Sequence, residues 1–510
     1  MKTQDPREGF GMYFPKKRYV PEALPSFEHG NLPSPVLEAE PGLVEMYWFC
    51  WDVASKNLRS PVAGSPLVSN WLDAAFSGNI FQWDTCFMMM FGRYGHWQFP
   101  SIQSLDNFYC RQRPSGYICR EIRSHDGTEV MFGHHGGFDD PAGWANTINP
   151  PLFGWAECED FKVSGDKSRF AAVLPVLEKY VAWLNRDGDP GAKTENWESN
   201  GRRSGGTPHQ LYWNTPLGCG MDNTPKPAEK GAGWVDMSCQ MAMQYNDLAC
   251  ICRELGLSSK AAAFEAEAQR IAERINQWCW NEADGFYYDV LADGTQFRKK
   301  TSGGFWPMIA GVASKAQAQR LVAHLKDERE FWRPFVFPTL SADEPEYKPD
   351  GGYWLGAVWA PTNYAIIKGL ELYGEEDFAT EASLRYIKAM LETYRTSGTV
   401  WENYAPESLS QGTPAKPDFV GWSGVGPITL LIENVLGFRP DGVRKQLAWR
   451  LARRDRHGIE RLRFGTVQAD LLYDGQGSVS VRTNEPFTLI LNGIAYKLAE
   501  GEHKLAAKPL

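Results

Sequence analysis

The sequence predicts a mainly helical fold, a toroid of helices with a small β region at its C-terminal end. Apolar residues recur at spacings of three and four in five long segments, as in amphipathic helices. The segments SGGFWPMIAGVAS at 302–314 and DGGYWLGAVWAPTNY at 350–364 share a Gly-Gly-aromatic-Trp loop that leads into a helix. They indicate a repeated helical hairpin. After Pro440 the apolar residues alternate with a period of two, which is typical of β-strands.

Residues 1–44 are expected to form an extended arm rather than a domain. The first forty residues contain six prolines and show little periodicity. From residue 45 to residue 440 we expect one all-α domain, in which long loops rich in Gly, Pro, Asn and Trp separate the helices and no strands intervene. The expected helices cover 166–184, 258–281, 314–326, 357–373 and 378–394.

The segment 258–281 has the clearest helical pattern. Ser258 and Ser259 precede its first turn as expected caps. Its apolar residues then alternate between spacings of four and three: Phe264, Ala268, Ile271, Ile275 and Trp278.

The last segment, 441–510, is predicted to be a small β module. SVSVRT at 478–483 and FTLILNG at 487–493 alternate or run apolar, and DGQG at 474–477 is typical of a turn. The module holds no obvious cluster of catalytic residues, so we expect it to pack against the helical domain.

Charge and composition exclude several classes of protein. The chain has 53 basic and 62 acidic residues, a formal charge of −9, which argues against a nucleic-acid partner. No stretch is apolar enough for a membrane span, and the N-terminus lacks the apolar region of a signal peptide, so we expect a cytoplasmic protein. The sequence leaves the oligomeric state open.

The cysteines and histidines indicate neither a metal nor another cofactor. The ten cysteines form no C-x-x-C pair, and their surroundings of Met, Ala and Trp favour buried thiols in a reducing compartment. The adjacent His134 and His135 would point apart on regular structure and have no evident third ligand. We therefore predict that the protein needs no cofactor and binds no metal.

Several loops place an aromatic residue beside a polar one. This combination suits sugars, because a pyranose stacks its apolar face on a ring while its hydroxyls need directional hydrogen bonds. A small carbohydrate is therefore the expected partner. The loops are FQWDTCF at 81–87, GYICRE at 116–121, NPPLFGWA at 149–156, GMDNTP at 220–225, GGYWLGAVW at 351–359, WENYAP at 401–406 and GWSG at 421–424.

Two carboxylates in these loops are candidates for glycoside hydrolysis, which needs one acid to protonate the leaving oxygen and a second to activate water or attack carbon. Asp222 lies in a loop with Gly220 and Pro225 and could instead serve only an Asx turn. Glu402 lies among aromatic residues, where burial would raise its pKa. Its alternative role is an edge residue that accepts from a backbone donor.

The segments QWDTCF, GYICRE, GMDNTP, GGYWLGAVWAPTNY and WENYAP, in this order, resemble the signature segments of glycoside hydrolase family 63 and its trehalase-like relatives. The resemblance spans roughly residues 45 to 437. It implies an (α/α)6 barrel whose loops at one end form a pocket for inverting hydrolysis of α-glycosidic bonds. Asp222 would be the general acid and Glu402 the general base, with their carboxyl groups about 6.5–9.5 Å apart.

The same resemblance implies the residues that bind the sugar. Trp83 and Asp84 match the family's W-D segment, although Thr85 and Cys86 depart from its usual Ser-aromatic pair. Asp84 would bind hydroxyls, or else be a buried N-cap. Arg120, in a loop where Cys119 replaces Pro, would bind substrate or tune a carboxylate, or else pair with Glu121. The remaining candidates are Asn149, whose amide would bind a hydroxyl, Asn223 beside the acid, and the pocket walls Tyr353, Trp354, Trp359, Tyr404 and Trp422. For any one of these five rings, packing in the core is the favoured alternative.

The function expected on these grounds is an inverting α-glycoside hydrolase that removes a terminal glucose or mannose from a short glycoside or oligosaccharide. Leu355 and Ala357 replace an Arg and a Pro of the family pattern, so substrate preference cannot be transferred from any one member. Two alternatives are a sugar epimerase or isomerase on a similar toroid, which would use paired histidines, and a carbohydrate-binding protein without catalysis.

Overall fold

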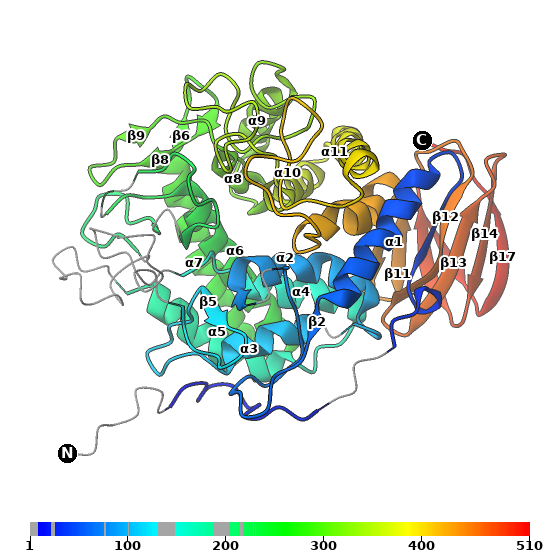
Figure 1. Cartoon of the computed structure of the whole chain (residues 1–510), viewed down its shortest axis with the longest axis horizontal. Coiled ribbons are helices and arrows are strands. Elements are labelled where there is room, and N and C mark those ends of the chain that lie inside the picture. Colours follow the sequence, from blue (N-terminus) through cyan, green and yellow to red (C-terminus); the bar gives the residue numbers. More distant parts are fainter. Residues whose placement is uncertain are drawn as a thin grey trace.

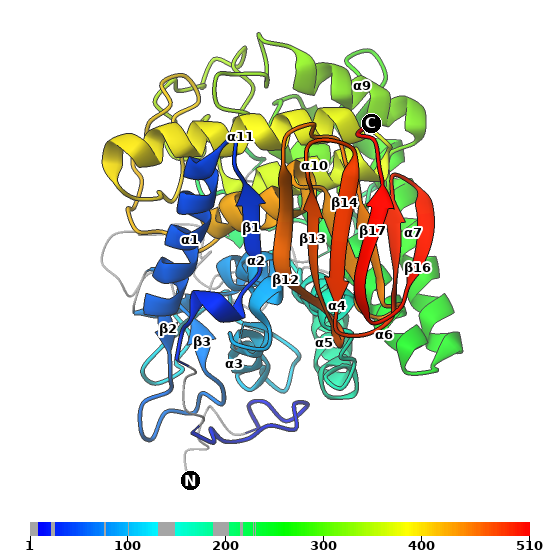
Figure 2. The same cartoon turned by 90° about the vertical axis from the view of Figure 1, so that its right-hand side faces the viewer.

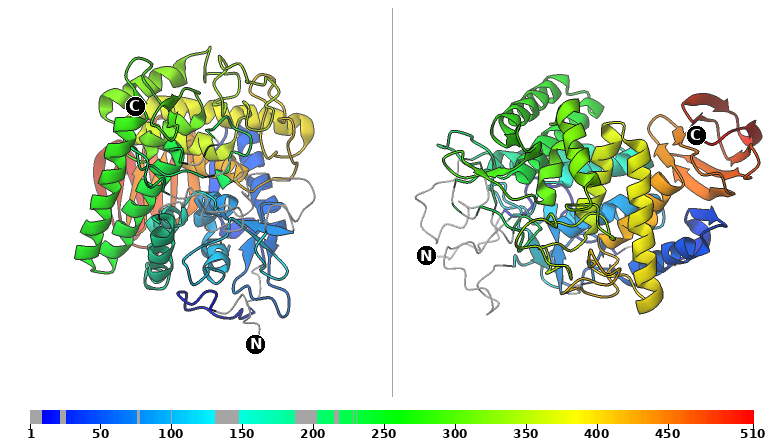
Figure 3. Two further views of the ribbon diagram at one scale, coloured as in Figure 1. Left: turned by 90° about the vertical axis from the view of Figure 1, so that its left-hand side faces the viewer. Right: turned by 90° about the horizontal axis from the view of Figure 1, so that it is seen from above.

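The computed structural model describes residues 9–21, 26–75, 78–99, 101–130, 148–186, 203–214, 218–227, 229 and 231–510. His134 and His135 lie outside these residues. A helical body makes up most of the molecule, and β-strands from the C-terminal segment pack at one end of it (Figure 1). Seen from above, the strands project from one side of the helical body (Figure 3). Within the described residues no helix is both long and apolar enough to cross a bilayer.

The five helices expected from the apolar spacing are all present. They are α5 (Phe170–Leu184), α7 (Ser258–Trp278), α9 (Lys315–Lys326), α10 (Ala360–Leu372) and α11 (Glu376–Ser397). In α7 the buried face is Ala261, Ala268, Ile271 and Ile275, which agrees with the apolar stripe. The predicted serine caps of α7 are wrong, because Leu257 is the N-cap residue and no side chain caps it.

Other helices were missed by the search for apolar stripes. They are α1 (Pro41–Lys56), α2 (Gln82–Gly92), the short α3 (Asp106–Tyr109), α4 (Phe153–Ser164), α6 (Val235–Glu254), the short α8 (Trp306–Ile309) and a π-helix, η8 (Gly426–Val435). All eleven residues of α2 and all ten of η8 are buried. A helix that is buried on every side shows no polar face, so its sequence carries no amphipathic period.

Six of the helices, five missed and one predicted, contact one another in series. Helix α2 packs against α4, α4 against α6, α6 against α8, α8 against α10, α10 against η8, and η8 returns to α2. Of the helices outside this series, α5 and α7 pack on α6, and α1 and α11 pack on η8. The six helices α2, α4, α6, α8, α10 and η8 are called the inner helices below.

The expectation that no strands lie among the helices is wrong. Within the described residues, four two-stranded antiparallel ribbons are inserted between the helices. They pair β2 (Leu58–Arg59) with β3 (Trp71–Leu72), β4 (Asn79–Phe81) with β5 (Glu121–Arg123), β6 (Trp280–Asn281) with β7 (Phe286–Tyr287), and β8 (Asp289–Val290) with β9 (Gln296–Phe297). Each strand has two or three residues, too few for a period of two to be visible in the sequence.

The C-terminal β region consists of two sheets. One sheet has the order β1-β12-β13-β14-β17 and the other β10-β11-β15-β16. The chain is therefore not all-α. The strands are β10 (Phe438–Asp441), β11 (Gln446–Trp449), β12 (His457–Phe464), β13 (Val467–Tyr473), β14 (Ser478–Thr483), β15 (Phe487–Leu491), β16 (Ile494–Leu498) and β17 (Gly501–Ala506).

The N-terminal segment, expected to be an extended arm, contributes a strand to this region. Strand β1 (Ser34–Leu37) pairs antiparallel with β12, so that Ser34 lies opposite Glu460 and Leu37 opposite His457. Figure 2 shows β1 at the edge of the sheet, next to α1. The segment that precedes the helical body is thus joined to the segment that follows it.

Candidate active site

A pocket of about 60 Å³ brings together most of the residues that the sequence singles out. Nine of the twelve candidates line it, and they come from seven separate loops or helix starts. Phe81 and Gly220 also line the pocket, although they were not among the candidates. The nine are Trp83, Asp84, Arg120, Asn149, Asp222, Tyr353, Trp354, Glu402 and Trp422.

The ribbon of β4 and β5 places Asp84 and Arg120 at the same wall of the pocket. Phe81 pairs with Glu121, and the amide of Gln82 donates to the carbonyl of Arg120 at 2.8 Å. Asp84 lies in the first turn of α2, whose N-cap is Phe81, so Asp84 itself is not an N-cap. The Asp84 side chain is buried, and its Oδ1 accepts no hydrogen bond from any described residue. The residue nevertheless lines the pocket, where it would face a bound ligand.

The loop that carries Asp222 packs tightly against Trp83. Gly220 has a φ of +80°, and a Cβ at this position would lie 2.8 Å from the indole ring. Only glycine adopts this conformation without strain and leaves room for the ring. Gly220 could have been found in the sequence, since it lies two residues before a candidate acid.

Asn223 holds the Asp222 loop to the loop of Tyr353 and Trp354. Its Nδ2 donates to the carbonyl of Gly352 at 3.0 Å, and the amide of Trp354 donates to its Oδ1 at 2.8 Å. The side chain of Asn223 is exposed and does not line the pocket. The contacts of Asn223 are therefore those of a link between two loops of the site.

Glu402 is fixed by backbone pairing and by its aromatic neighbours. Its amide donates to the carbonyl of Lys416 at 2.9 Å, and the amide of Lys416 donates to Oε2 at 3.2 Å. The hydroxyl of Tyr353 lies 3.4 Å from Oε1, and the indole of Trp422 donates to the Glu402 carbonyl at 2.8 Å. Glu402 thus accepts from a backbone donor, as expected for a purely structural edge residue, and it also lines the pocket.

Burial shifts the ionisation of all three pocket carboxyl groups. It raises the pKa of Glu402 to about 7, with a further increase from the negative charge of Asp222. It also raises the pKa of Asp222 above its ordinary value, while the cation of Arg120 acts in the opposite direction. The pKa of Asp84 is raised well above its usual range by burial and by the charges of Glu402 and Asp222. Such shifted carboxyl groups are typical of acid–base sites.

Arg120 and Asn149 are each held by protein contacts at the pocket wall. Arg120 Nη2 lies 3.2 Å from Glu121 Oε2, so the structural ion pair that was the alternative to substrate binding is present. Arg120 also lines the pocket. Asn149 accepts from the amide of Trp83 at 3.3 Å and donates to the carbonyl of Gly218 at 3.1 Å. Both residues therefore have structural contacts beside any role in binding.

Two of the predicted walls do not line the pocket. Trp359 stacks behind Trp354, with ring centroids 3.8 Å apart and an angle of 7° between the rings. Tyr404 is fully buried beside Phe335, and its hydroxyl accepts from the amide of Trp401 at 3.1 Å. Large aromatic residues fill cores as readily as sugar sites, and their local sequence does not separate the two roles.

The described residues contain no group of three or more His, Cys, Asp or Glu side chains that could hold a metal ion. All ten cysteines are free thiols, and nine of them are buried.

Comparisons with known proteins identify the family. A family model described as the mannosylglycerate hydrolase MGH1-like glycoside hydrolase domain matches residues 79–423. An uncharacterized protein of Borreliella burgdorferi is 26% identical over 404 residues, covering 77% of this chain and 79% of its own. A probable mannosyl-oligosaccharide glucosidase of Schizosaccharomyces pombe is 24% identical over 288 residues, which cover 51% of this chain and 34% of the yeast protein.

A putative periplasmic trehalase of Salmonella typhi is 21% identical over 401 residues, covering 68% of this chain and 64% of its own. The chain therefore matches about a third of the yeast protein and just under two thirds of the Salmonella protein.

Among solved structures, the GH63 mannosylglycerate hydrolase of Thermus thermophilus in complex with glucose shares the fold. Its TM-score is 0.55 at 17% identity, covering 74% of this chain and 98% of that one. The family match covers well over half of the chain. As its resemblance to family 63 predicted, the chain belongs to the mannosylglycerate hydrolase MGH1-like glycoside hydrolases.

Proposed function

We propose that this glycoside hydrolase cleaves a terminal α-linked glucose or mannose from a short glycoside or oligosaccharide, with inversion at the anomeric carbon. The observation that carries the proposal is that Asp222 and Glu402 line one small pocket together with Trp354 and Trp422. A pocket of this kind admits the end of a glycan rather than the middle of a long chain. Its aromatic walls suit the apolar face of a pyranose.

In the proposed mechanism Asp222 is the general acid and Glu402 the general base. Asp222 gives its proton to the departing glycosidic oxygen while Glu402 removes a proton from the attacking water. Burial favours the protonated state that Asp222 needs before the reaction. Tyr353 and the amide of Lys416 hold the carboxylate of Glu402 at the pocket.

Asp84 and Arg120 are proposed to bind the sugar that is cleaved. Asp84 would accept a hydrogen bond from a sugar hydroxyl, and the guanidinium of Arg120 would donate one while its charge compensates the carboxyl groups of the pocket. The described lining of the pocket contains no histidine, whereas an epimerase on a helical toroid would need a pair of them.

The series of inner helices fits the inner layer of an (α/α)6 barrel, and we propose that architecture for residues 45–440. The barrel would be preceded by the segment 1–44 and followed by the β module 441–510. We propose the cytoplasm as the location, since the free, mostly buried thiols suit a reducing compartment.

The test is a screen of α-linked glucosides and mannosides, including trehalose, glycosylglycerates and oligosaccharide ends, with product detection by NMR. We expect turnover of at least one substrate by the wild type and a loss of about 10²–10⁴-fold in kcat for Asp222→Asn and for Glu402→Gln. Asp377→Asn is the matched control, because its side chain is 97% exposed and lies on α11. Wild-type turnover by both pocket variants would overturn the proposal.

A further inference from the structure

A second, larger cavity lies away from the catalytic pocket and shares no residue with it. Its volume is about 490 Å³. Helices α2, α4, α10 and η8 begin beside loops of the catalytic pocket and end at this cavity, which also borders the middle of α6. We call it the far cavity. Its lining includes Arg93, Trp155, Asp247, Tyr364, Lys368 and Glu433.

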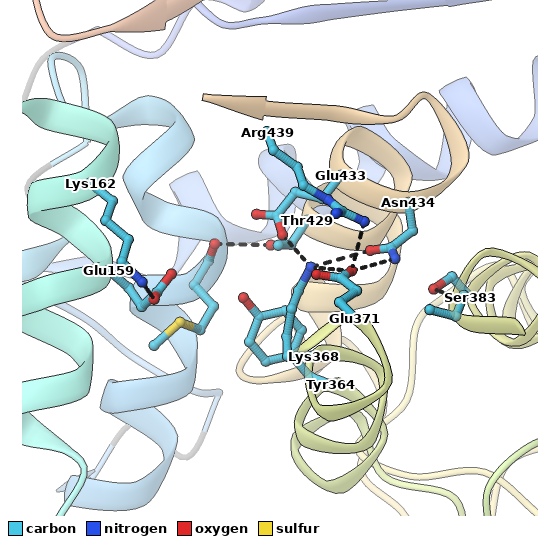
Figure 4. A network of polar contacts seen from close by, with 12 residues as sticks. Glu159, Lys162, Tyr364, Lys368, Glu371, Ser383, Thr429, Glu433, Asn434 and Arg439 are labelled. Carbon is cyan, nitrogen blue, oxygen red and sulfur yellow. Dashed lines mark hydrogen bonds and ion pairs between the residues drawn. The ribbon is translucent and has the colours of Figure 1, made fainter. Parts of the chain in front are cut away.

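Every cation that lines the far cavity is already paired with carboxylates. Arg93 Nη2 lies 2.6 Å from Glu433 Oε1, and Lys368 Nζ lies 2.6 Å from Glu433 Oε2 and 2.8 Å from Glu371 Oε1. Arg439 contacts Glu376 at 2.6 Å, and Lys162 pairs with Glu159. Figure 4 shows the group around Glu433 on one side and the pair of Glu159 and Lys162 on the other. An anionic ligand would have to compete with these carboxylates.

The balance of charge favours a cation instead. The lining contains four cations and five carboxylates, the fifth being Asp247. The Asp247 side chain has no hydrogen bond or ion pair with any described residue, and its Oδ2 is out of contact with solvent. Helix C-termini carry a partial negative charge, so the ends of α2, α4, α10 and η8 add to the negative potential. Burial raises the pKa of Asp247 well above its ordinary value while the charge of Lys162 lowers it, and a bound cation would favour the ionised form.

Asp247 is closely packed against the start of α4, and two aromatic rings line the same cavity. A Cβ on Gly154 would lie 2.8 Å from the Cβ of Asp247, so the absence of a side chain at Gly154 lets α4 and α6 approach at this point. The next residue, Trp155, lines the cavity beside Tyr364, with ring centroids 5.9 Å apart. The same cavity thus holds a carboxylate without a hydrogen-bond or ion-pair partner and two aromatic rings, which together are the groups that bind ammonium ions.

We propose that the far cavity is a binding site for a small organic ammonium ion, whose charge pairs with Asp247 and whose apolar groups pack against Trp155 and Tyr364. An organic cation fits better than a metal ion, because the described residues offer no cluster of three metal ligands. The site is independent of the catalytic pocket, so it does not depend on the proposed reaction.

Choline and its uncharged isostere 3,3-dimethylbutan-1-ol separate charge recognition from shape. Isothermal titration calorimetry of the full-length protein, at ionic strength matched with sodium chloride, should give one choline site per chain. We expect the alcohol to bind at least about tenfold more weakly. Equal affinity for the two compounds, or no heat with choline into the millimolar range, would overturn the proposal.

Single substitutions test whether choline binds in the far cavity. Asp247→Asn should weaken choline binding about tenfold or more, whereas Glu328→Gln, which removes an exposed charge outside the cavity, should leave it unchanged. Glu402→Gln should also leave choline binding intact. Loss of binding in Glu402→Gln with retention in Asp247→Asn would assign choline to the catalytic pocket and contradict the proposal. Circular dichroism checks the fold of each variant, and if Asp247→Asn does not fold, the comparison of choline with the alcohol on the wild type decides.

Discussion

The hydroxyl of Tyr353 lies 3.4 Å from Oε1 of Glu402, and Tyr353 reaches this position with a φ of +66°. A positive φ is uncommon for a bulky residue and costs about 1–3 kcal/mol, so the surrounding loops must hold it. Asn223 bonds to the residues on either side of Tyr353, and the indole of Trp359 donates to the Tyr353 carbonyl at 3.1 Å. The loop of the proposed acid therefore positions the residue that contacts the proposed base.

Tyr353→Phe should lower kcat about fivefold to tenfold with little change in KM, because it removes one hydrogen bond to Glu402 and keeps the ring in the pocket wall. Steady-state kinetics on the best substrate of the screen checks this. A large rise in KM at unchanged kcat would instead mean that the hydroxyl binds substrate.

Tyr404→Phe is a prediction about stability. The change leaves the amide of Trp401 without its acceptor in a partly buried site, so we expect the free energy of unfolding to fall by about 0.5–1.5 kcal/mol. Because Tyr404 does not line the pocket, KM should stay at the wild-type value. Denaturant unfolding and kinetics on the same preparation test both parts. A raised KM with unchanged stability would mean that Tyr404 binds the substrate.

An α-glycosyl fluoride distinguishes the proposed acid from the proposed base. Fluoride leaves without protonation, so Asp222→Asn should recover most of its lost rate on this substrate relative to an ordinary glycoside. Glu402→Gln should stay about 10²–10⁴-fold slower than the wild type on both, since water still needs a base. The two roles are assigned in reverse if Glu402→Gln is the variant that fluoride rescues.

The pH dependence of kcat/KM follows from the coupled ionisation of Asp222 and Glu402. The active form carries one proton, on Asp222. Burial, together with the charge that Asp222 carries once it is ionised, raises the pKa of Glu402 to about 7. The pair loses its last proton near that value, so kcat/KM should fall as the pH rises above about 7. It should also fall at acid pH, below the raised pKa of Asp222, where both groups are protonated.

Asp222→Asn provides the control for this profile. With the fluoride substrate the variant needs only an ionised Glu402, so its rate should rise with pH to a plateau and lack the alkaline decline. Without the charge of Asp222, the pKa of Glu402 should also lie below about 7. An alkaline decline that persists in Asp222→Asn would assign it to another group.

The sequence predicted much of the lining of this pocket, for an identifiable reason. Asp222, Glu402, Asp84 and Arg120 lie in short motifs that can be compared with a family, and all four line one pocket. Spacing alone could not separate Trp354 in the pocket wall from Trp359 behind it, because both are buried rings in the same loop. Phe81 was missed because its position depends on the pairing of β4 with β5, a contact between residues about 40 positions apart.

The fold shows the same limit. The amphipathic helices α5, α7, α9 and α11 were predicted because each keeps one face toward solvent. Helix α10 was predicted from its spacing although ten of its thirteen residues are buried. Helices α2 and η8 were missed, because they are buried all round. The strand β1 could not be predicted, since its partner β12 lies more than 400 residues further along the chain.

The anomer that is released first tests the central claim most directly. Proton NMR during the first minutes of hydrolysis of an α-linked substrate, before mutarotation equilibrates the product, reports the configuration at the anomeric carbon. Water activated by Glu402 on the face opposite the leaving group should give the β-anomer first. Initial release of the α-anomer would contradict an inverting acid–base pair of Asp222 and Glu402.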